Sequence, residues 1–182
     1  MMNRACFLDR DGVVNAEVNY LHEPERVIIL PGVVDALRLL REHQCKIIVV
    51  TNQAGVAKNL YAESDILAVH QRISDLIAPF EVGIDAFYYC PHHPDHSGEC
   101  LCRKPMPGML LRAAREHDID LSKSAMIGDR LSDIEAGRNA GCVFNCLVKT
   151  GYGQEVIAKH DVSGITVADN ILFAVEKFLG LD

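Results

Sequence analysis

The chain has 182 residues, of which 49% are hydrophobic and 24% are charged, and its formal net charge is −7. These values are typical of a single soluble globular domain spanning residues 1–182, and the negative charge argues against a nucleic-acid or anionic-membrane surface. Because no apolar run approaches the ~18 residues of a membrane span, and the N-terminus carries no signal-peptide pattern, we expect a cytoplasmic protein with no membrane partner.

Short apolar runs and amphipathic segments alternate along the chain. Strands are predicted at 5–8, 46–50, 84–89, 124–128, 143–148 and 164–167. Helices are predicted to begin at Pro31 and to span 63–78, 107–117, 131–140 and 171–179. This alternation predicts an α/β fold, with a mainly parallel sheet, helices on both faces and right-handed crossovers.

The first predicted strand ends in two acidic residues, Asp9 and Asp11, followed by Gly12. Two neighbouring carboxylates repel unless a cation or a shared proton relieves them, and ligands bind at the carboxyl ends of strands in α/β sheets. The pattern therefore indicates a metal-dependent reaction centre, in which one aspartate serves as nucleophile and the other as acid/base. The alternative is a plain Asp-Gly turn. A calcium loop is excluded because Val13 and Tyr20 occupy ligand positions.

Two further strand ends and one loop carry polar residues of the same kind. Thr51 and Asn52 follow the second predicted strand, Asp129 follows the fourth, and the basic pair Arg103-Lys104 precedes a helix. A phosphoryl-transfer site needs a nucleophile, a proton donor, carboxylates that hold a divalent cation, and fixed donors for the phosphate oxygens. These strand ends supply each of those groups.

The seven cysteines fall into two groups. Those in or beside apolar runs are predicted to be core residues: Cys6, Cys45, Cys142 and Cys146. The others lie in a polar loop and, with a histidine, form a candidate tetrahedral zinc site: Cys90, Cys100 and Cys102, with His92, His93 or His96 as the fourth ligand. The alternative is a cysteine-bearing loop without metal.

Five segments in order resemble the motifs of one known family. The chain resembles the haloacid dehalogenase (HAD) superfamily of phosphatases, in the branch that contains heptose 1,7-bisphosphate and histidinol-phosphate phosphatases. The segments are Phe-Leu-Asp-Arg-Asp-Gly (7–12), Val-Val-Thr-Asn-Gln-Ala-Gly (49–55), Tyr-Cys-Pro-His-His-Pro (89–94), Cys-Leu-Cys-Arg-Lys-Pro-Met-Pro-Gly-Met (100–109) and Ile-Gly-Asp-Arg-Leu-Ser-Asp (127–133).

The resemblance implies a three-layer α/β/α Rossmann-like fold and a role for each matching residue. Asp9 matches the nucleophile that forms an aspartyl-phosphate, and Asp11 matches the general acid/base. Magnesium would bind the Asp9 carboxylate, the Asp11 main-chain carbonyl and Asp129. Thr51 and Lys104 match groups that hold the transferring phosphoryl, assisted by Asn52, and Arg103 matches a substrate-recognition residue.

Other positions are defined less sharply by the resemblance. Arg130 stands where heptose phosphatases often carry lysine, so the positive charge is kept on a longer, forked side chain. Asp133 is expected to be either an anchor behind the site or an acid in the first turn of a helix. The spacing between the motifs leaves no room for a cap domain. The rim of the open site would be formed by the zinc loop and by Glu17, Val18, Asn19 and Tyr20, which would contact the sugar.

The family pattern also favours His92 as the fourth zinc ligand, because of its spacing from Cys90. A zinc ion on this loop, residues 90–102, would offset the cost of ordering it and would fix Arg103 and Lys104 directly after Cys102. The expected function is a monomeric, Mg²⁺- and Zn²⁺-binding phosphatase that removes the 7-phosphate of D-glycero-D-manno-heptose 1,7-bisphosphate. The alternatives are a histidinol-phosphate phosphatase and, in a different class, an inactive zinc-stabilised binding module.

Overall fold

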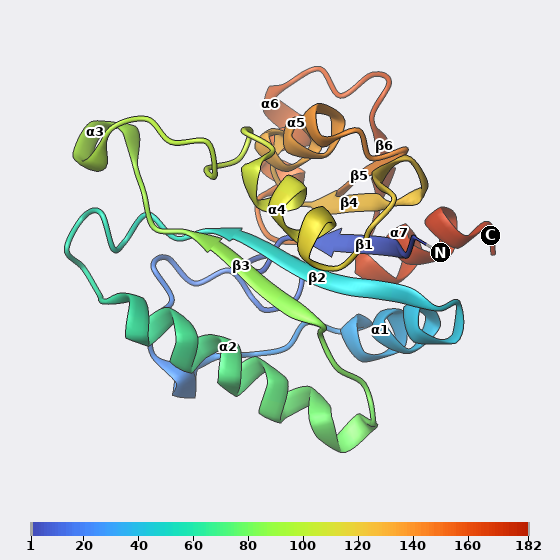
Figure 1. The fold of residues 1–182 in the computed structure, drawn as a ribbon, viewed down its shortest axis with the longest axis horizontal. Coiled ribbons are helices and arrows are strands. Elements are labelled where there is room, and N and C mark those ends of the chain that lie inside the picture. Colours follow the sequence, from blue (N-terminus) through green and yellow to red (C-terminus); the bar gives the residue numbers. More distant parts are fainter. Residues whose placement is uncertain (1, 182) are drawn as a thin grey trace.

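A computed structural model describes residues 2–181, in which a parallel sheet lies between two layers of helices (Figure 1). The six strands pair only in parallel with one another, in the order β3-β2-β1-β4-β5-β6. They are β1 (Arg4–Leu8), β2 (Cys45–Asn52), β3 (Ala86–Cys90), β4 (Ala125–Gly128), β5 (Phe144–Val148) and β6 (Thr166–Ala168). The three-layer Rossmann-like arrangement predicted from the sequence is confirmed.

The helices divide between the two faces of the sheet (Figure 1). One face is covered by α1 (Val33–Glu42), α2 (Glu63–Ile77) and α7 (Ile171–Leu179), and the other by α4 (Gly108–Glu116) and α5 (Leu131–Ala140). The shorter helices are η1 (Pro24–Arg26), η2 (Ala78–Phe80), α3 (Pro94–Ser97), η3 (Leu121–Lys123) and α6 (Gly153–Lys159). Within residues 2–181, we find no helix with the length and apolarity that a membrane crossing requires.

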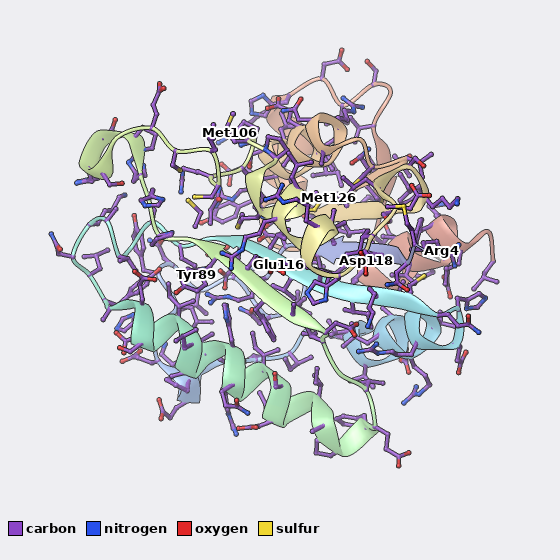
Figure 2. All side chains as sticks on the ribbon, viewed as in Figure 1. Arg4, Tyr89, Met106, Glu116, Asp118 and Met126 are labelled. Atoms are coloured by element: carbon purple, nitrogen blue, oxygen red, sulfur yellow. The ribbon has the colours of Figure 1, made fainter. Side chains whose placement is uncertain are left out.

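Alternation along the strands produces a separate apolar core on each face. In β1, Cys6 and Leu8 belong to the core under α1, α2 and α7, whereas Ala5 and Phe7 belong to the core under α4 and α5. All four are completely buried, as expected for a central strand whose successive side chains point to opposite faces. Figure 2 shows these layers filled by side chains, with Met126 of β4 beneath α4. The four cysteines predicted for the core are buried.

The strands predicted at 84–89 and 164–167 begin two residues later, at Ala86 and Thr166. Three further segments differ from the sequence prediction. The first helix begins at Val33 rather than Pro31, because Gly32 adopts a left-handed backbone with φ of 83°. The polar loop contains the one-turn helix α3, whose Asp95 N–H donates to the His93 ring. Helix α6 was not predicted, since Gly153 alone of its residues is buried and no apolar periodicity marks it.

The strand order places the candidate catalytic residues at the carboxyl ends of the central strands. Strand β1 lies between β2 and β4, so the chain order reverses direction beside β1, and such switch points bind ligands at the carboxyl ends of strands. Figure 2 shows Arg4 at the amino end of β1 and Tyr89 near the carboxyl end of β3. Among the described residues, the chain between β1 and β2 holds only η1 and α1, and that between β2 and β3 only α2 and η2, so neither connection contains a cap domain.

Candidate active site

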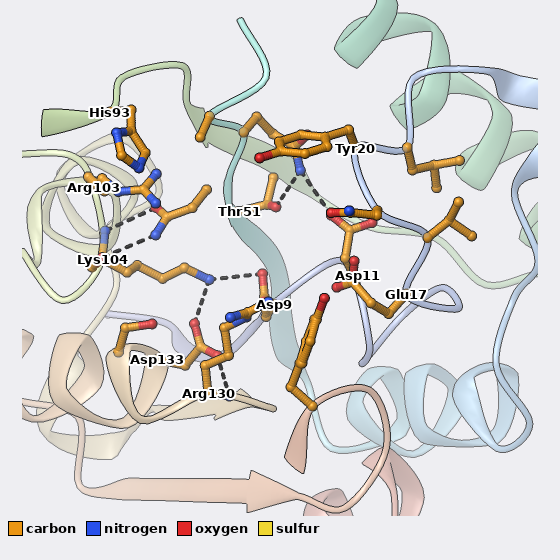
Figure 3. A pocket seen from close by; sticks show the side chains of 18 of the residues that line it. Asp9, Asp11, Glu17, Tyr20, Thr51, His93, Arg103, Lys104, Arg130 and Asp133 are labelled. Atoms are coloured by element: carbon orange, nitrogen blue, oxygen red, sulfur yellow. Dashed lines mark hydrogen bonds and ion pairs between the residues drawn. The ribbon is translucent and has the colours of Figure 1, made fainter. Parts of the chain in front are cut away.

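A cavity of about 360 Å³ lies at the carboxyl ends of the central strands (Figure 3). Every residue predicted from the sequence to take part in catalysis or to bind substrate lines it: Asp9, Asp11, Glu17, Val18, Asn19, Tyr20, Thr51, Asn52, Arg103, Lys104 and Arg130. These residues come from four separate stretches of chain. The fold therefore brings together the residues predicted from the strand ends, the loop before Lys104 and the rim, while their individual roles remain predictions.

Asp9 emerges from the end of β1 into a site that is nearly closed to solvent. Its backbone N–H donates to the carbonyl of Ile127 at 2.9 Å, which continues the pairing of β1 with β4 by one residue. Its Oδ1 accepts from the Arg10 backbone N–H at 2.8 Å and from Lys104 Nζ at 2.9 Å. Burial raises the pKa of Asp9 to about 7, against the opposing charge of Lys104. The carboxylate is thus fixed in place and poorly solvated, as a nucleophile should be.

Lys104 is the buried cation that faces this carboxylate (Figure 3). Its Nζ lies 2.9 Å from Asp9 Oδ1 and 2.7 Å from Asp133 Oδ1, and it donates to the Val50 carbonyl at 2.7 Å. Burial alone would lower the pKa of Lys104, but the charges of Asp133 and Asp9 raise it well above its ordinary value. One hydrogen bond and two close ion pairs therefore hold the side chain beside the nucleophile.

Asn52 holds the backbone that carries Lys104. Its Oδ1 accepts from the Lys104 backbone N–H at 3.0 Å, and its Nδ2 donates to the Lys104 carbonyl at 3.1 Å. The structure shows this contact with the Lys104 backbone, whereas assistance of Asn52 to phosphate binding stays a prediction. Asn52, the last residue of β2, thus both donates to and accepts from the backbone of Lys104, and these two bonds fix the position of the lysine in the cavity.

Asp129, at the end of β4, has the features of a metal ligand. It is completely buried, its Oδ2 accepts from the Tyr152 backbone N–H at 2.8 Å, and its Oδ1 has no hydrogen-bond partner within residues 2–181. Burial, followed by the charges of Asp9 and Asp133, raises the pKa of Asp129 to about 8. A buried carboxylate oxygen without a donor, close to a second carboxylate, fits a hard divalent cation such as Mg²⁺.

Two glycines permit the loops to close around Asp129. A Cβ at Gly12 would lie 2.2 Å from Asp129 Oδ2, and a Cβ at Gly151 would lie 2.1 Å from it. Both residues also have positive φ angles, 83° and 57° respectively. A side chain at either position would displace the carboxylate, so the Asp-Gly sequence after β1 has a packing function as well as a turn function.

Asp133 proves to combine the two roles that the sequence left open. It belongs to a group with Asp9 and Asp129 whose carboxylate oxygens lie within 4.8 Å of one another. However, Asp133 Oδ1 lies 2.7 Å from Lys104 Nζ, and its Oδ2 accepts from the Arg130 backbone N–H at 3.0 Å at the start of α5. Because Asp133 Oδ1 is ion-paired with Lys104 and Oδ2 accepts a backbone N–H, Asp133 anchors Lys104 and caps the helix. Within residues 2–181, Asp129 Oδ1 has no hydrogen bond or ion pair and is the oxygen available to a cation.

Asp11 is turned toward a different set of donors. Its Oδ1 accepts from Asn15 Nδ2 at 2.9 Å, its Oδ2 accepts from Gln53 Nε2 at 2.9 Å, and Arg10 Nη2 reaches both oxygens at 3.0 and 2.9 Å. Arg10 is completely buried, whereas the Asp11 side chain is 17% exposed and borders the cavity. The two acids therefore have different surroundings, because Asp9 is paired with buried Lys104 and Asp11 is paired with buried Arg10.

The rim of the cavity carries several cations and aromatic rings. Lys58 Nζ donates to the Tyr20 hydroxyl at 2.7 Å, and the Arg130 guanidinium lies 3.8 Å from the centre of the Tyr152 ring. Arg103 Nη1 donates to the His92 carbonyl at 3.1 Å. Positive side chains thus surround the opening of a cavity whose base carries aspartates, and this positive charge suits an anionic substrate.

The zinc-ligand prediction is supported by the positions of the donor atoms. Cys90 Sγ lies 3.6 Å from Cys100 Sγ and 3.0 Å from Cys102 Sγ, while His92 Nδ1 lies 3.3 Å from Cys102 Sγ. Four ligands around a tetrahedral zinc with Zn–S bonds of 2.3 Å would have edges of about 3.8 Å, close to this spacing. Of the three candidate histidines, His92 joins this group, whereas His93 caps α3.

The thiol chemistry of the loop is also consistent with metal binding. Although burial raises the pKa of Cys100, hydrogen bonds from the backbone of Arg103 and from neighbouring thiols lower it to about 7, whereas burial raises the pKa values of Cys90 and Cys102. Cys100 is therefore the readily ionised thiol of the three. A thiol that readily becomes a thiolate is the form that binds zinc.

Some residues that line the cavity were not predicted from the sequence: Gln53, Lys58, Tyr61, His93, Ser132 and Tyr152. Gln53 lies inside a quoted motif, but its side-chain direction is not visible in a sequence. Tyr152 follows the fifth strand by four residues. Extending the strand-end argument to that strand would have found it.

Comparisons with known proteins place this site in a family. The HAD-hydrolase-like family model matches residues 101–173. A D-glycero-D-manno-heptose-1,7-bisphosphate 7-phosphatase of Thermosynechococcus vestitus is 39% identical over 97% of this chain and 95% of its own length. A D-glycero-beta-D-manno-heptose-1,7-bisphosphate 7-phosphatase of Haemophilus influenzae is 42% identical over 82% of this chain and 84% of its own.

A solved structure is similar over nearly the whole fold. The D,D-heptose 1,7-bisphosphate phosphatase of B. bronchiseptica, in complex with magnesium and phosphate, superposes with a TM-score of 0.88. It is 34% identical and covers 98% of this chain and 99% of its own. Together with the buried Asp9–Lys104 pair and the free oxygen of Asp129, these similarities show that the chain belongs to the HAD family of phosphatases and is a phosphoric monoester hydrolase.

Proposed function

We propose that this protein hydrolyses the 7-phosphate of D-glycero-D-manno-heptose 1,7-bisphosphate. The observation that carries the proposal is the 39% identity, over 97% of the chain, to a phosphatase named for that reaction. The cavity supports it, because an acidic floor for phosphoryl transfer is bordered by the cationic side chains of Lys58, Arg103 and Arg130, which suit a substrate with a second phosphate.

In the proposed reaction, an Asp9 carboxylate oxygen attacks phosphorus and forms an aspartyl-phosphate. The bond from phosphorus to the sugar oxygen breaks, and the leaving oxygen takes a proton from Asp11. Asp11 then takes a proton from a water molecule, whose oxygen attacks phosphorus, and phosphate leaves while the Asp9 carboxylate is restored. Thr51 and Lys104 border the phosphoryl position and would balance its charge.

Asp9 and Asp129, with the Asp11 main-chain carbonyl, would hold the magnesium ion. When bound, Mg²⁺ supplies the positive charge that keeps these buried carboxylates ionised and neutralises the phosphate oxygens. The buried, unpartnered Oδ1 of Asp129 supports this assignment.

A substrate panel tests the proposed function. We expect kcat/KM for the heptose bisphosphate to exceed that for histidinol phosphate and fructose 1,6-bisphosphate by about 100-fold, because the rim groups pair only with a correctly spaced second phosphate. Both anomers should be assayed by phosphate release. Equal rates for heptose bisphosphate and histidinol phosphate would contradict the proposal and favour the histidinol-phosphate alternative.

The effect of Mg²⁺ on stability should depend on pH. Burial raises the pKa of Asp9 to about 7 and that of Asp129 to about 8, above the ordinary value of 3.8, so the folded metal-free protein favours the protonated forms. Its stability should therefore fall as pH rises from about 4 toward 8, and Mg²⁺ should restore it. Thermal unfolding should show a larger Mg²⁺-induced rise in Tm at pH 8 than at pH 6. In Asp129→Asn, an equal rise at pH 8 would contradict the assignment.

Removal of zinc should lower both stability and activity. We propose that Cys90, His92, Cys100 and Cys102 bind one zinc ion, which fixes the loop that leads into Arg103 and Lys104. Chelation, or Cys102→Ser, is expected to lower Tm on the order of 10 °C and to reduce phosphatase activity. Zinc content is measured by elemental analysis, with Cys142→Ala as the control because Cys142 is a buried thiol outside the cluster. A zinc-free protein with wild-type Tm would refute the site.

We further propose that residues 1–182 form a single phosphatase domain that acts as a monomer in the cytoplasm. The residues that line the cavity are arranged around one continuous sheet, which supports a single domain. The cysteines of the described structure are all free thiols, which suits a reducing compartment.

A further inference from the structure

The side-chain amide of Gln53 bonds to two residues of the candidate active site, Asp11 and Thr51. Its Nε2 donates to Asp11 Oδ2 and to Thr51 Oγ1, both at 2.9 Å, and Figure 3 shows Thr51 and Asp11 on either side of this contact. Gln53 is 3% exposed and lies directly after β2, where its backbone N–H donates to the Cys90 carbonyl at 2.8 Å. A buried amide with both protons in use cannot rotate without breaking hydrogen bonds.

The orientation of this amide is fixed from behind by Tyr61. The Tyr61 hydroxyl donates to Gln53 Oε1 at 2.8 Å. A carboxylate can only accept, so the Gln53 nitrogen must face Asp11 and its oxygen must face Tyr61. Because burial raises the pKa of Tyr61, the phenol keeps the proton that it donates.

The packing around Tyr61 leaves little alternative to this position. The ring stacks on His22 with centroids 5.3 Å apart, and a Cβ at Gly55 would lie 2.0 Å from Tyr61 Cε1. Glycine at position 55 is therefore required for the ring to lie against the loop after β2. The hydrogen bonds therefore run in one direction: Tyr61 donates to Gln53, and Gln53 donates to Asp11 and Thr51.

The direction of these hydrogen bonds also affects the Thr51 hydroxyl. The Thr51 hydroxyl accepts from Gln53, and Thr51 is 1% exposed and borders the cavity. A hydroxyl has one proton, and the side occupied by the Gln53 N–H is closed to it. The proton is thus available for donation to a phosphate oxygen bound in the cavity.

We propose that Gln53, held by Tyr61, is a positioning residue that fixes the direction of the Asp11 carboxylate and of the Thr51 hydroxyl for phosphoryl transfer. The proposal rests on the phosphatase reaction at this site, not on heptose as the substrate. It concerns orientation, so its effects should appear in kcat more than in KM.

Three variants test the proposal on a sugar phosphate and on 4-nitrophenyl phosphate. Gln53→Met and Gln53→Glu both remove the N–H donors, and we expect kcat to fall about 100-fold while KM changes less than about 3-fold. Tyr61→Phe removes only the group that orients the amide, and we expect a loss of about 5-fold. Gln71→Glu and Tyr89→Phe are matched controls that should keep wild-type kcat, because these side chains bond to Asp75 and Glu63 outside the cavity.

A double-mutant cycle separates positioning from a general structural effect. If Tyr61 acts through Gln53, Tyr61→Phe should have no further effect on kcat in the Gln53→Met background. The same 5-fold loss in both backgrounds would overturn the proposal, as would Gln53→Met with wild-type kcat. Thermal unfolding and zinc content confirm that each variant is folded. If Gln53→Glu does not fold, because it places a carboxylate beside Asp11, Gln53→Met carries the test.

The leaving group tests the Asp11 half of the proposal. Nitrophenolate needs little protonation as it leaves, so the loss in Gln53→Met should be larger for the sugar phosphate than for 4-nitrophenyl phosphate. Equal losses would overturn the link to Asp11. Because each comparison is a ratio to wild type on the same substrate, failure of the heptose assignment would appear separately, in the substrate preference of the wild-type protein.

Discussion

Asp9→Asn is expected to lower phosphate release on the order of 10⁴-fold or more in a protein that stays folded. The amide is nearly the same size as the carboxylate but is a far weaker nucleophile, so no aspartyl-phosphate forms. Burial opposes ionisation of Asp9, as its raised pKa shows, so the neutral amide should not destabilise the metal-free protein at pH 8. Steady-state kinetics and thermal unfolding measure the two effects.

The matched control is Asp35→Asn, which makes the same chemical change at an exposed residue paired with Arg38 at 2.7 Å. It should retain wild-type turnover and stability, because exposed ion pairs contribute little. Residual turnover in Asp9→Asn above about 1% of wild type would argue against covalent catalysis by this residue, provided that mass spectrometry excludes deamidation back to aspartate.

Lys104→Met should have the largest effect on stability. Methionine fills much of the same space as lysine. However, it has no ammonium group, so Asp9 and Asp133 are left buried without their cation. Removing one partner of a buried ion pair costs about 3–5 kcal/mol, and the lost charge at the phosphoryl position should lower kcat on the order of 10³-fold. Urea unfolding at pH 8 measures the stability loss. At pH 6 the loss should be smaller, because a carboxylate with a raised pKa can then take a proton.

Two comparisons make the lysine experiment specific. Lys149→Met is the control, because Lys149 forms an exposed ion pair with Asp169 and should tolerate the change. Lys104→Arg should not rescue activity, since the forked guanidinium cannot place three donors toward Asp9, Asp133 and Val50 as an ammonium does. A Lys104→Met protein with wild-type unfolding at pH 8 would show that the buried pair contributes no net stability.

The parts of the fold that follow from periodicity were predictable from the sequence. Strand β1 was recognised because an uninterrupted apolar run ends in acids, and the amphipathic pattern of α2 set its limits within one residue. Helix α6 was missed because a short surface helix with one buried residue leaves no periodic signal. Pro31 misplaced the start of α1, since the left-handed turn at Gly32 depends on how the chain enters the helix.

Within the site, the sequence predicted which residues take part more readily than it predicted their hydrogen-bond and ion-pair partners. The strand-end rule predicted that Asp9, Thr51 and Asp129 lie at the same end of the sheet, because parallel strands share a direction. It could not show that Asn52 pairs with the backbone of Lys104, or that both oxygens of Asp133 are occupied. Those contacts join residues far apart in sequence, and their directions follow from side-chain rotamers that a single sequence does not encode.

The hydrogen bonds between Asn52 and Lys104 fix the end of the polar loop independently of its middle. The ends of the polar loop are tied to the sheet, at Cys90 through β3 and at Lys104 through Asn52, while α3 and its neighbours project outward. Of residues 93–99 only His93 borders the cavity, so insertions or deletions after it would change the outer part of the loop without moving the lysine beside the nucleophile. The length of this segment is therefore the part of the loop that can vary while the position of Lys104 beside Asp9 stays unchanged.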